Sequence, residues 1–312
     1  VESYIEERPD SALNVLQGMD KGELSGKEEK AKHALLLSMA MDKNYIDRTD
    51  FDVLQPAIDF YEDHGSATDK LRTYYYQGRI YQNAGNDAAA MESFVNSLDV
   101  GSESNDNLTK ARILVAQSNI YYSLMKWEKV CDVNIEAANY YNELGRTNNY
   151  VYCLLRCIGG YIQSNNFDKA KDLLGKCYQY TENLPELLIS EIYSYHLLYS
   201  VAANNFESVP LIIGEYKNKV SEENIDYLTV AGAYADIGAY DKAEDMLVRI
   251  NTKSLEDNNK TLKYYTTLIR IYRHKGDYRK VYESYLKFNE LNDSILFSIF
   301  ESDTQFVEER HA

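Results

Sequence analysis

Hydrophobic and small residues recur along the chain in a pattern ten residues long. It begins with a tyrosine, places a glycine or asparagine four residues later and an aromatic residue two further on, and ends on a small residue, as in Tyr234, Gly238, Tyr240 and Ala243. This third position falls at Asp87, Trp127, Phe167, Phe206, Tyr240 and Tyr278, so it is aromatic in five of the six copies and the period is 34 to 40 residues. A period of this length predicts an array of stacked helical pairs.

The spacing of the pattern has a physical cause. The tyrosine and the small residue fall on helix faces that pack against the partner helix of the same pair, and small side chains let two helices approach closely. The glycine or asparagine marks a tight turn in which a positive φ is useful. Two weaker copies precede the six, at Pro9–Ala12 and Leu54–Ala57.

This pattern resembles the tetratricopeptide (TPR) repeat. The fullest matches are Tyr227, Val230, Ala231, Tyr234, Gly238, Tyr240, Ala243, Leu247 and Ile250, and then Tyr74, Gln77, Gly78, Tyr81, Gly85, Ala90 and Phe94. We therefore expect an all-α fold, a right-handed superhelix of about eight TPR-like pairs. We expect divergent pairs over residues 1–69, the repeat array over 70–296, and a cap or connecting helix over 297–312. Periods above 34 predict longer helices or longer connections between pairs.

A narrower resemblance lies in the first part of the chain. It rests on Pro9–Leu13, Ala34–Leu36, Asp42–Asn44, Ala57–Tyr61, His64–Gly65, Tyr74–Tyr76, Gly78–Tyr81 and Asn83–Gly85. This series is similar to the sensor half of Bacteroidetes-type TPR transcriptional regulators. The resemblance implies repeats on the extracytoplasmic, periplasmic side of a membrane, followed by a membrane helix, a coiled segment and a DNA-binding domain. It also implies a membrane anchor outside the residues shown and a possible homodimer through the C-terminal helix.

Charge and composition exclude several functions. The chain has 312 residues and a net charge of −16, which argues against wrapping nucleic acid or docking on an anionic membrane surface. The residues shown contain no n-region or h-region of a signal peptide, and from the opening at Val1 rather than Met we expect a trimmed or processed end. The longest apolar run, Ile295–Phe300, is too short to span a bilayer.

The sequence offers no catalytic or metal-binding constellation, and we expect neither an enzyme nor a cofactor. The four cysteines lack the Cys-x-x-Cys spacing of a zinc site, and buried free thiols are the favoured interpretation. None of the five histidines forms a metal or nucleophile motif, and His196 falls on an inward helical position that favours a packed imidazole. Gly26–Lys27 lacks the strand and the hydroxyl residue of a phosphate-binding loop.

The candidate site is the concave side of the array, which the first helix of each pair should line. The predicted ligand-binding residues are Arg72, Tyr75, Arg79, Arg112, Asn119, Tyr122 and Tyr152, with a second basic patch at Lys263, Arg270 and Arg273. Arginine forks recognise carboxylates and tyrosine offers a flat apolar face, so this groove suits a peptide, particularly an acidic one, or a protein partner.

Three alternatives remain open from the sequence. The arginines could pair with acids of the same chain instead of a ligand. The C-terminal tail, Phe297 to Phe306, could fill the middle of the concave side. The whole protein could be an extracytoplasmic glycan-binding lipoprotein resembling the starch-utilisation type, because that class also combines TPR helices with many aromatic residues. Most of the 29 tyrosines are expected at packing positions between helices.

Overall fold

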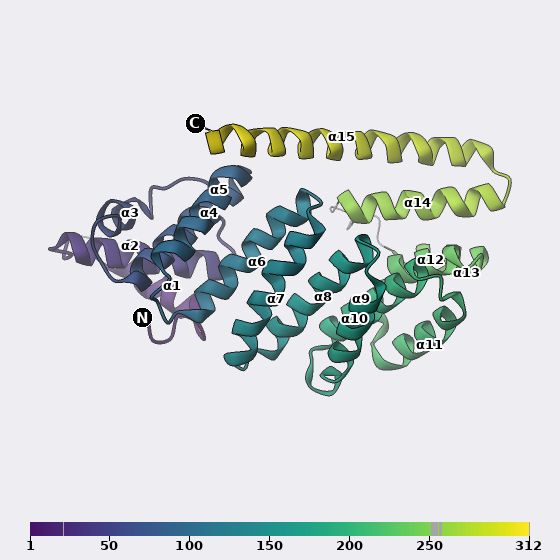
Figure 1. Cartoon of the computed structure of the whole chain (residues 1–312), viewed down its shortest axis with the longest axis horizontal. Helices are drawn as coiled ribbons and strands as arrows, with labels where there is room; N and C mark the ends of the chain where they lie inside the picture. Colours follow the sequence, from purple (N-terminus) through teal and green to yellow (C-terminus); the bar gives the residue numbers. More distant parts are fainter. Residues whose placement is uncertain (21, 251–254, 256–257, 312) are drawn as a thin grey trace. The chain divides into compact units, whose positions relative to one another are not determined.

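The chain folds entirely into helices. The computed structural model describes residues 1–20, 22–250, 255 and 258–311, with side chains as far as residue 301. Over these ranges the regular elements are α-helices and short 3₁₀ helices, without a strand (Figure 1). The prediction of an all-α helical repeat is confirmed.

The described helices form two compact units; the first comprises Val1–Leu124 and residues 302–311, and the second comprises Met125–Glu301. The first unit contains α1 (Pro9–Gly18), α2 (Lys27–Lys43), α3 (Gln55–Tyr61), α4 (Ala67–Asn83), α5 (Asp87–Val100) and α6 (Asn107–Ser123). Each of these helices packs on the next one, and in addition α2 packs on α4 and α4 on α6. The three first helices of successive pairs therefore lie in contact as one layer.

The second unit continues the same arrangement. It contains α7 (Trp127–Glu143), α8 (Thr147–Gln163), α9 (Phe167–Tyr178), α10 (Glu186–Ala202), α11 (Val209–Lys219), α12 (Tyr227–Asp236), α13 (Tyr240–Leu247), α14 (Asn258–His274) and the start of α15 (Tyr278–His311). Short 3₁₀ helices lie at Thr181–Asn183, Phe206–Ser208 and Glu222–Asn224. Here α8, α10, α12 and α14 form the layer of first helices.

The turn inside each of six pairs has the same geometry. Three residues separate the two helices, and the middle one has a positive φ: Gly85, Met125, Asn165, Asn204, Gly238 or Gly276. The second helix then begins at the position that the sequence pattern marks, namely Asp87, Trp127, Phe167, Tyr240 or Tyr278; in the remaining pair a short 3₁₀ helix begins at Phe206 and α11 follows from Val209. The expected tight turns are thus confirmed, and the longer periods arise from helices of 17 residues and from longer connections between pairs.

Close packing inside the pairs explains the small residues of the pattern. Ala90 and Ala243 are fully buried. A Cβ on Gly78 of α4 would lie 2.5 Å from the Phe94 ring of α5, so the absence of a side chain lets these two helices meet. At the start of α4, Ser66 and Asp69 form a capping box that satisfies two backbone N–H groups.

A buried tyrosine organises the core of the second unit. Tyr216 of α11 is fully buried, and its ring stacks on that of Tyr193 with 5.2 Å between centroids. Its hydroxyl lies 2.5 Å from the Ser190 hydroxyl and accepts a 2.9 Å hydrogen bond from the backbone N–H of Asp226. One phenol therefore ties together α10, α11 and the start of α12.

The last helix exposes large apolar side chains along the part that the structure describes. On α15, Tyr278, Tyr282, Phe297 and Phe300 are all more than 60% exposed. The tail residues from Phe306 onward lie outside the residues whose side chains are described. The predicted boundaries at residues 69/70 and 296/297 stay predictions, as does the hand of a superhelix.

Candidate functional site

Five cations line the layer of first helices in the first unit. We call this set the cationic face: Lys32 and Lys43 on α2, Arg72 and Arg79 on α4, and Arg112 on α6. Arg72 and Arg79 lie seven residues apart, close to two turns of helix, and so project from the same side of α4. The predicted arginines therefore do come together, and two lysines that the sequence analysis missed join them.

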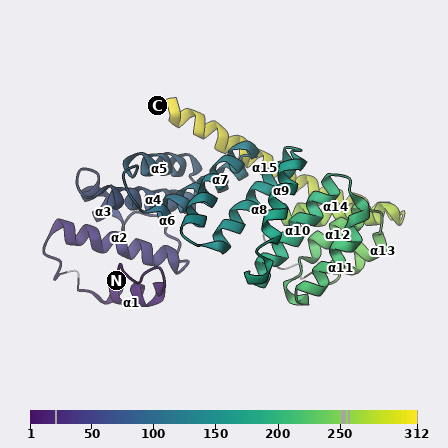
Figure 2. The same ribbon diagram turned by 60° about the horizontal axis from the view of Figure 1, so that its bottom comes forward.

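The N-terminal turn covers part of this face. Residues 1–8 form a helical turn that lies beside α1 and α2 (Figure 2). Glu2 accepts from Arg72 at 2.6 Å and pairs with Lys32 at 3.0 Å. Glu6 accepts two hydrogen bonds from the Arg112 guanidinium, at 2.9 and 2.7 Å, and pairs with Lys43 at 2.7 Å.

Aspartates of the same layer pair with the remaining donors. Arg72 also binds Asp106 at 2.6 Å, and Arg79 binds Asp42 at 3.0 Å. The three arginines thus pair with acids of the same chain, which was one of the alternatives that the sequence left open. Their role in binding a ligand stays a prediction.

The carboxylate of Glu6 is strongly stabilised in its charged form. Burial alone would raise its pKa, but the hydrogen bonds and charges of Arg112 and Lys43 outweigh burial and lower the pKa of Glu6 to about 2. Arg112 contributes more than Lys43 to lowering the pKa of Glu6, and burial and the charge of Arg112 lower the pKa of Lys43. A depressed pKa contributes stability at pH values above about 4.5, and this contribution is lost as the pH falls towards 2.

The other predicted ligand residues differ in exposure. Tyr75 is 5% exposed and packs on Tyr76 and Phe94, so its ring belongs to the core between α4 and α5. Asn119 is exposed on α6 and Tyr122 is half-buried there. Tyr152 is exposed on α8 of the second unit.

The second basic patch lies on α14. The Lys263 ammonium donates to the Thr229 hydroxyl at 2.9 Å, and burial lowers the pKa of this lysine despite the charges of Asp226 and Asp236. Arg270 pairs with Asp236, and Arg273 is exposed. Two of the three predicted cations are therefore engaged within the second unit.

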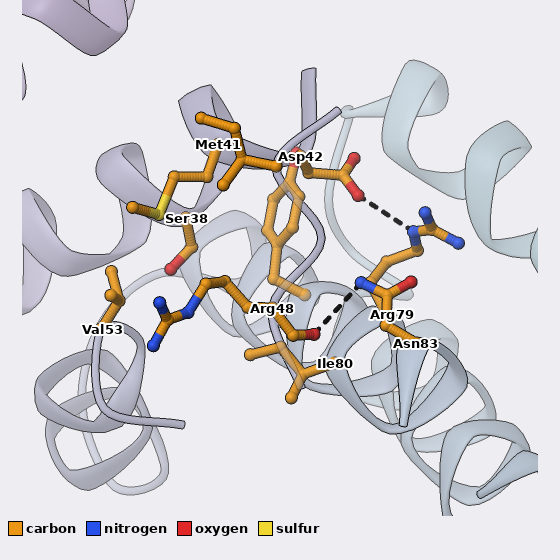
Figure 3. Close-up of a pocket in the computed structure, with 10 residues that line it drawn as sticks. Ser38, Met41, Asp42, Arg48, Val53, Arg79, Ile80 and Asn83 are labelled. Atoms are coloured by element: carbon orange, nitrogen blue, oxygen red, sulfur yellow. Dashed lines mark hydrogen bonds and ion pairs between the residues drawn. The ribbon is translucent and has the colours of Figure 1, made fainter. Parts of the chain in front are cut away.

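A small cavity lies beside the cationic face, between α2, α4 and the loop after α2. Arg79 and Asn83 line it, with the Arg79–Asp42 ion pair on one side and a 3.1 Å hydrogen bond from Asn83 to the Arg48 carbonyl on the other (Figure 3). Its free volume of about 20 Å³ accommodates about one water molecule. The Ser38 hydroxyl and the Arg48 Nε are buried without a partner at this cavity, which suits such a water.

The cysteines and His196 are packing residues in the described part of the chain. All four cysteines are free and buried, as expected, and burial raises the pKa of Cys153 and Cys177 to about 12. His196 bonds the Tyr178 hydroxyl at 2.8 Å, which confirms a packed imidazole. Among the described residues no group of His, Cys, Asp and Glu is placed to hold a metal ion. None of the described helices combines the length and the apolarity that crossing a membrane requires.

Comparison with known proteins identifies the fold. No family model matches the chain, and no curated protein matches it. The structure is similar to the crystal structure of a Rap protein complexed with competence and sporulation factor, with a TM-score of 0.60 and 14% sequence identity. The similarity covers 99% of this chain and 88% of that one. Both chains therefore share an all-α, TPR-like helical repeat fold.

Proposed function

We propose that this protein is a non-enzymatic binding module that takes a peptide or protein segment on its cationic face. The observation that carries the proposal is the gathering of five cations on three successive first helices, in a chain whose net charge is −16. The five cations are paired with carboxylates of the chain itself, and carboxylates of a partner that replace those of the N-terminal turn would be held by the same attraction. The Rap protein, which shares the fold, was solved in complex with another factor, and this supports a binding role for the repeat.

The biological setting is a further part of the proposal. We place the module as the extracytoplasmic, periplasmic sensor of a membrane-linked regulator, on the strength of the sequence resemblance alone. The complete reading frame tests this placement, because a regulator requires a membrane helix and a DNA-binding domain encoded with the repeats. A frame that lacks both would refute it without affecting the binding role.

Binding is tested with the full chain on an array of synthetic peptides of graded net charge. Retention should rise with acidic charge and fall as salt is added, because exposed charges are screened within about 10 Å at 0.1 M. Arg79→Gln should weaken retention, since this arginine belongs to the face but does not contact the N-terminal turn. Arg279→Gln is the matched control, because Arg279 is exposed on α15 and pairs only with Glu283 of its own helix among its described partners. No preference for acidic peptides, or equal effects of the two substitutions, would contradict the proposal.

A further inference from the structure

The N-terminal turn shows which arrangement of carboxylates the cationic face accepts. The backbone N–H of Ile5 donates to the Val1 carbonyl at 3.1 Å, and that of Arg8 donates to the Tyr4 carbonyl at 2.9 Å. These are the bonds of a helical turn, in which residues four apart lie on the same side. Glu2 and Glu6 have this spacing, so both carboxylates point to one side of the turn.

Each carboxylate joins two different helices of the layer. Glu2 lies between Lys32 of α2 and Arg72 of α4, and Glu6 lies between Lys43 of α2 and Arg112 of α6. The contacts are 2.6 to 3.0 Å long, the range of charge-assisted hydrogen bonds. Two carboxylates at helical spacing therefore satisfy four cations from three helices.

Few other contacts hold the turn in place. Within residues 1–8, Ile5 is the one buried side chain, and Glu2 keeps 44% of its side chain exposed. Without the two glutamates, the five cations of the face would retain ion pairs with Asp42, Asp69 and Asp106, and the charge of Asp47 also acts on Arg79. The uncovered face would thus carry an excess of one positive charge, and Lys43 and Arg112 would lose the carboxylate that pairs with both, which a new pair of carboxylates would replace.

We propose that the cationic face is a binding site for a helical protein segment with two carboxylates four residues apart, and that the N-terminal turn competes with this ligand. The inference rests on the proposed function and names its class of ligand. An apolar residue just before the second carboxylate, at the place of Ile5, would add a buried contact. Because the turn is part of the same chain, it acts at a high effective concentration and lowers the apparent affinity of any external segment.

The test uses the full chain and a labelled, acetylated peptide with the sequence of residues 1–12. The double variant Glu2→Gln/Glu6→Gln removes the internal carboxylates and leaves the five cations in place. Fluorescence anisotropy should show that this variant binds the peptide at least about tenfold more tightly than the wild-type chain, because the internal competitor is weakened. Both peptides carry Glu7→Gln and Asp10→Asn, so that the two glutamates under test are their only acidic side chains. An isomeric peptide, in which the residues at positions 4 and 6 are interchanged, then carries the same charge with the two carboxylates on opposite sides and should bind at least about tenfold more weakly.

Equal affinity of the wild-type chain and the double variant would overturn the competition, and equal affinity of the two peptides would overturn the spacing rule. Either result, together with acidic binding on the peptide array, would leave the proposed function standing. If the chain retained no acidic peptide on the array, the proposed function itself would be refuted. If circular dichroism shows that the double variant does not fold, the competition is tested instead by hydrogen exchange of the wild-type chain. Adding the peptide, but not its isomer, should then speed exchange at the Ile5 and Arg8 amides; unchanged exchange would refute the proposal.

Discussion

Gly160 provides a sharp test of the packing argument, because a methyl group at this position meets rigid neighbours. A Cβ added to Gly160 of α8 would lie 2.8 Å from the Cys131 sulfur and 3.1 Å from the Trp127 carbonyl oxygen, both on α7. Overpacking of this kind costs about 1–3 kcal/mol. Replacing glycine by alanine inside a helix gains about 0.8–1 kcal/mol. The net change for Gly160→Ala is therefore a loss of about 1 kcal/mol in the free energy of unfolding.

Gly175→Ala is the matched control. Gly175 lies inside α9 of the same unit, and a Cβ there would meet nothing within 4 Å. This substitution should stabilise the unit by about 0.8–1 kcal/mol through helix propensity alone. The two variants thus carry the same chemical change with opposite expected signs, and their difference measures the steric contact.

Urea unfolding followed by the fluorescence of Trp127, the only tryptophan of the chain, reports on this unit directly. With a denaturant slope of about 1–3 kcal/mol/M, the midpoint should fall by about 0.3–1 M for Gly160→Ala and rise for Gly175→Ala. A midpoint of Gly160→Ala equal to that of Gly175→Ala would refute the argument. If the Cys131 sulfur is the main obstacle, adding Cys131→Ala to Gly160→Ala should restore much of the loss.

Three further substitutions test other parts of the fold, each by thermal or urea unfolding. Ala90→Leu should destabilise the first unit by about 1–3 kcal/mol, because Ala90 is fully buried and the core has no room for a larger side chain; a neutral effect would contradict the close packing. Met125→Gly should raise stability by up to about 1 kcal/mol, since Met125 has a φ of 54°, and destabilisation would count against backbone strain at this turn. Tyr216→Phe should cost about 1–3 kcal/mol, because the Asp226 amide loses its acceptor and the Ser190 hydroxyl keeps only its bond to the Asn224 carbonyl; an unchanged stability would show that neither lost hydrogen bond matters.

The turns inside the pairs were predictable from the sequence because most of them contain a glycine or an asparagine at the residue with positive φ. A positive φ favours glycine and asparagine, and five of the six turn positions have one of these residues. Met125 adopts the same conformation without that preference, so only its place in the repeat pattern predicted the turn there. The start of the second helices could be read from the same pattern, since it follows the turn at a fixed distance.

The candidate site was predictable only in part. The spacing of Arg72 and Arg79 placed them on one side of α4, but their acidic partners include Glu2, which lies 70 residues away from Arg72 along the chain. No periodic pattern reports the path of the N-terminal turn, so neither Glu2 nor Glu6 could be predicted as a neighbour. Tyr75 lies three residues after Arg72 and therefore on the same side of α4, close enough to raise the pKa of Arg79, but its ring is buried against Tyr76 and Phe94, which spacing alone does not predict.

The uniform turns inside the pairs have a consequence for how such a chain tolerates changes in length. Each of the six turns has three residues, whereas six residues separate α5 from α6 and seven separate α9 from α10. The connection between α7 and α8 is an exception, with three residues and a positive φ at Gly145. An inserted residue in a three-residue turn would displace the residue with positive φ and rotate one helix against the next. An insertion into one of the longer connections would only lengthen a surface segment. Natural length variation, tags and protease cleavage sites should therefore collect in the longer connections between pairs.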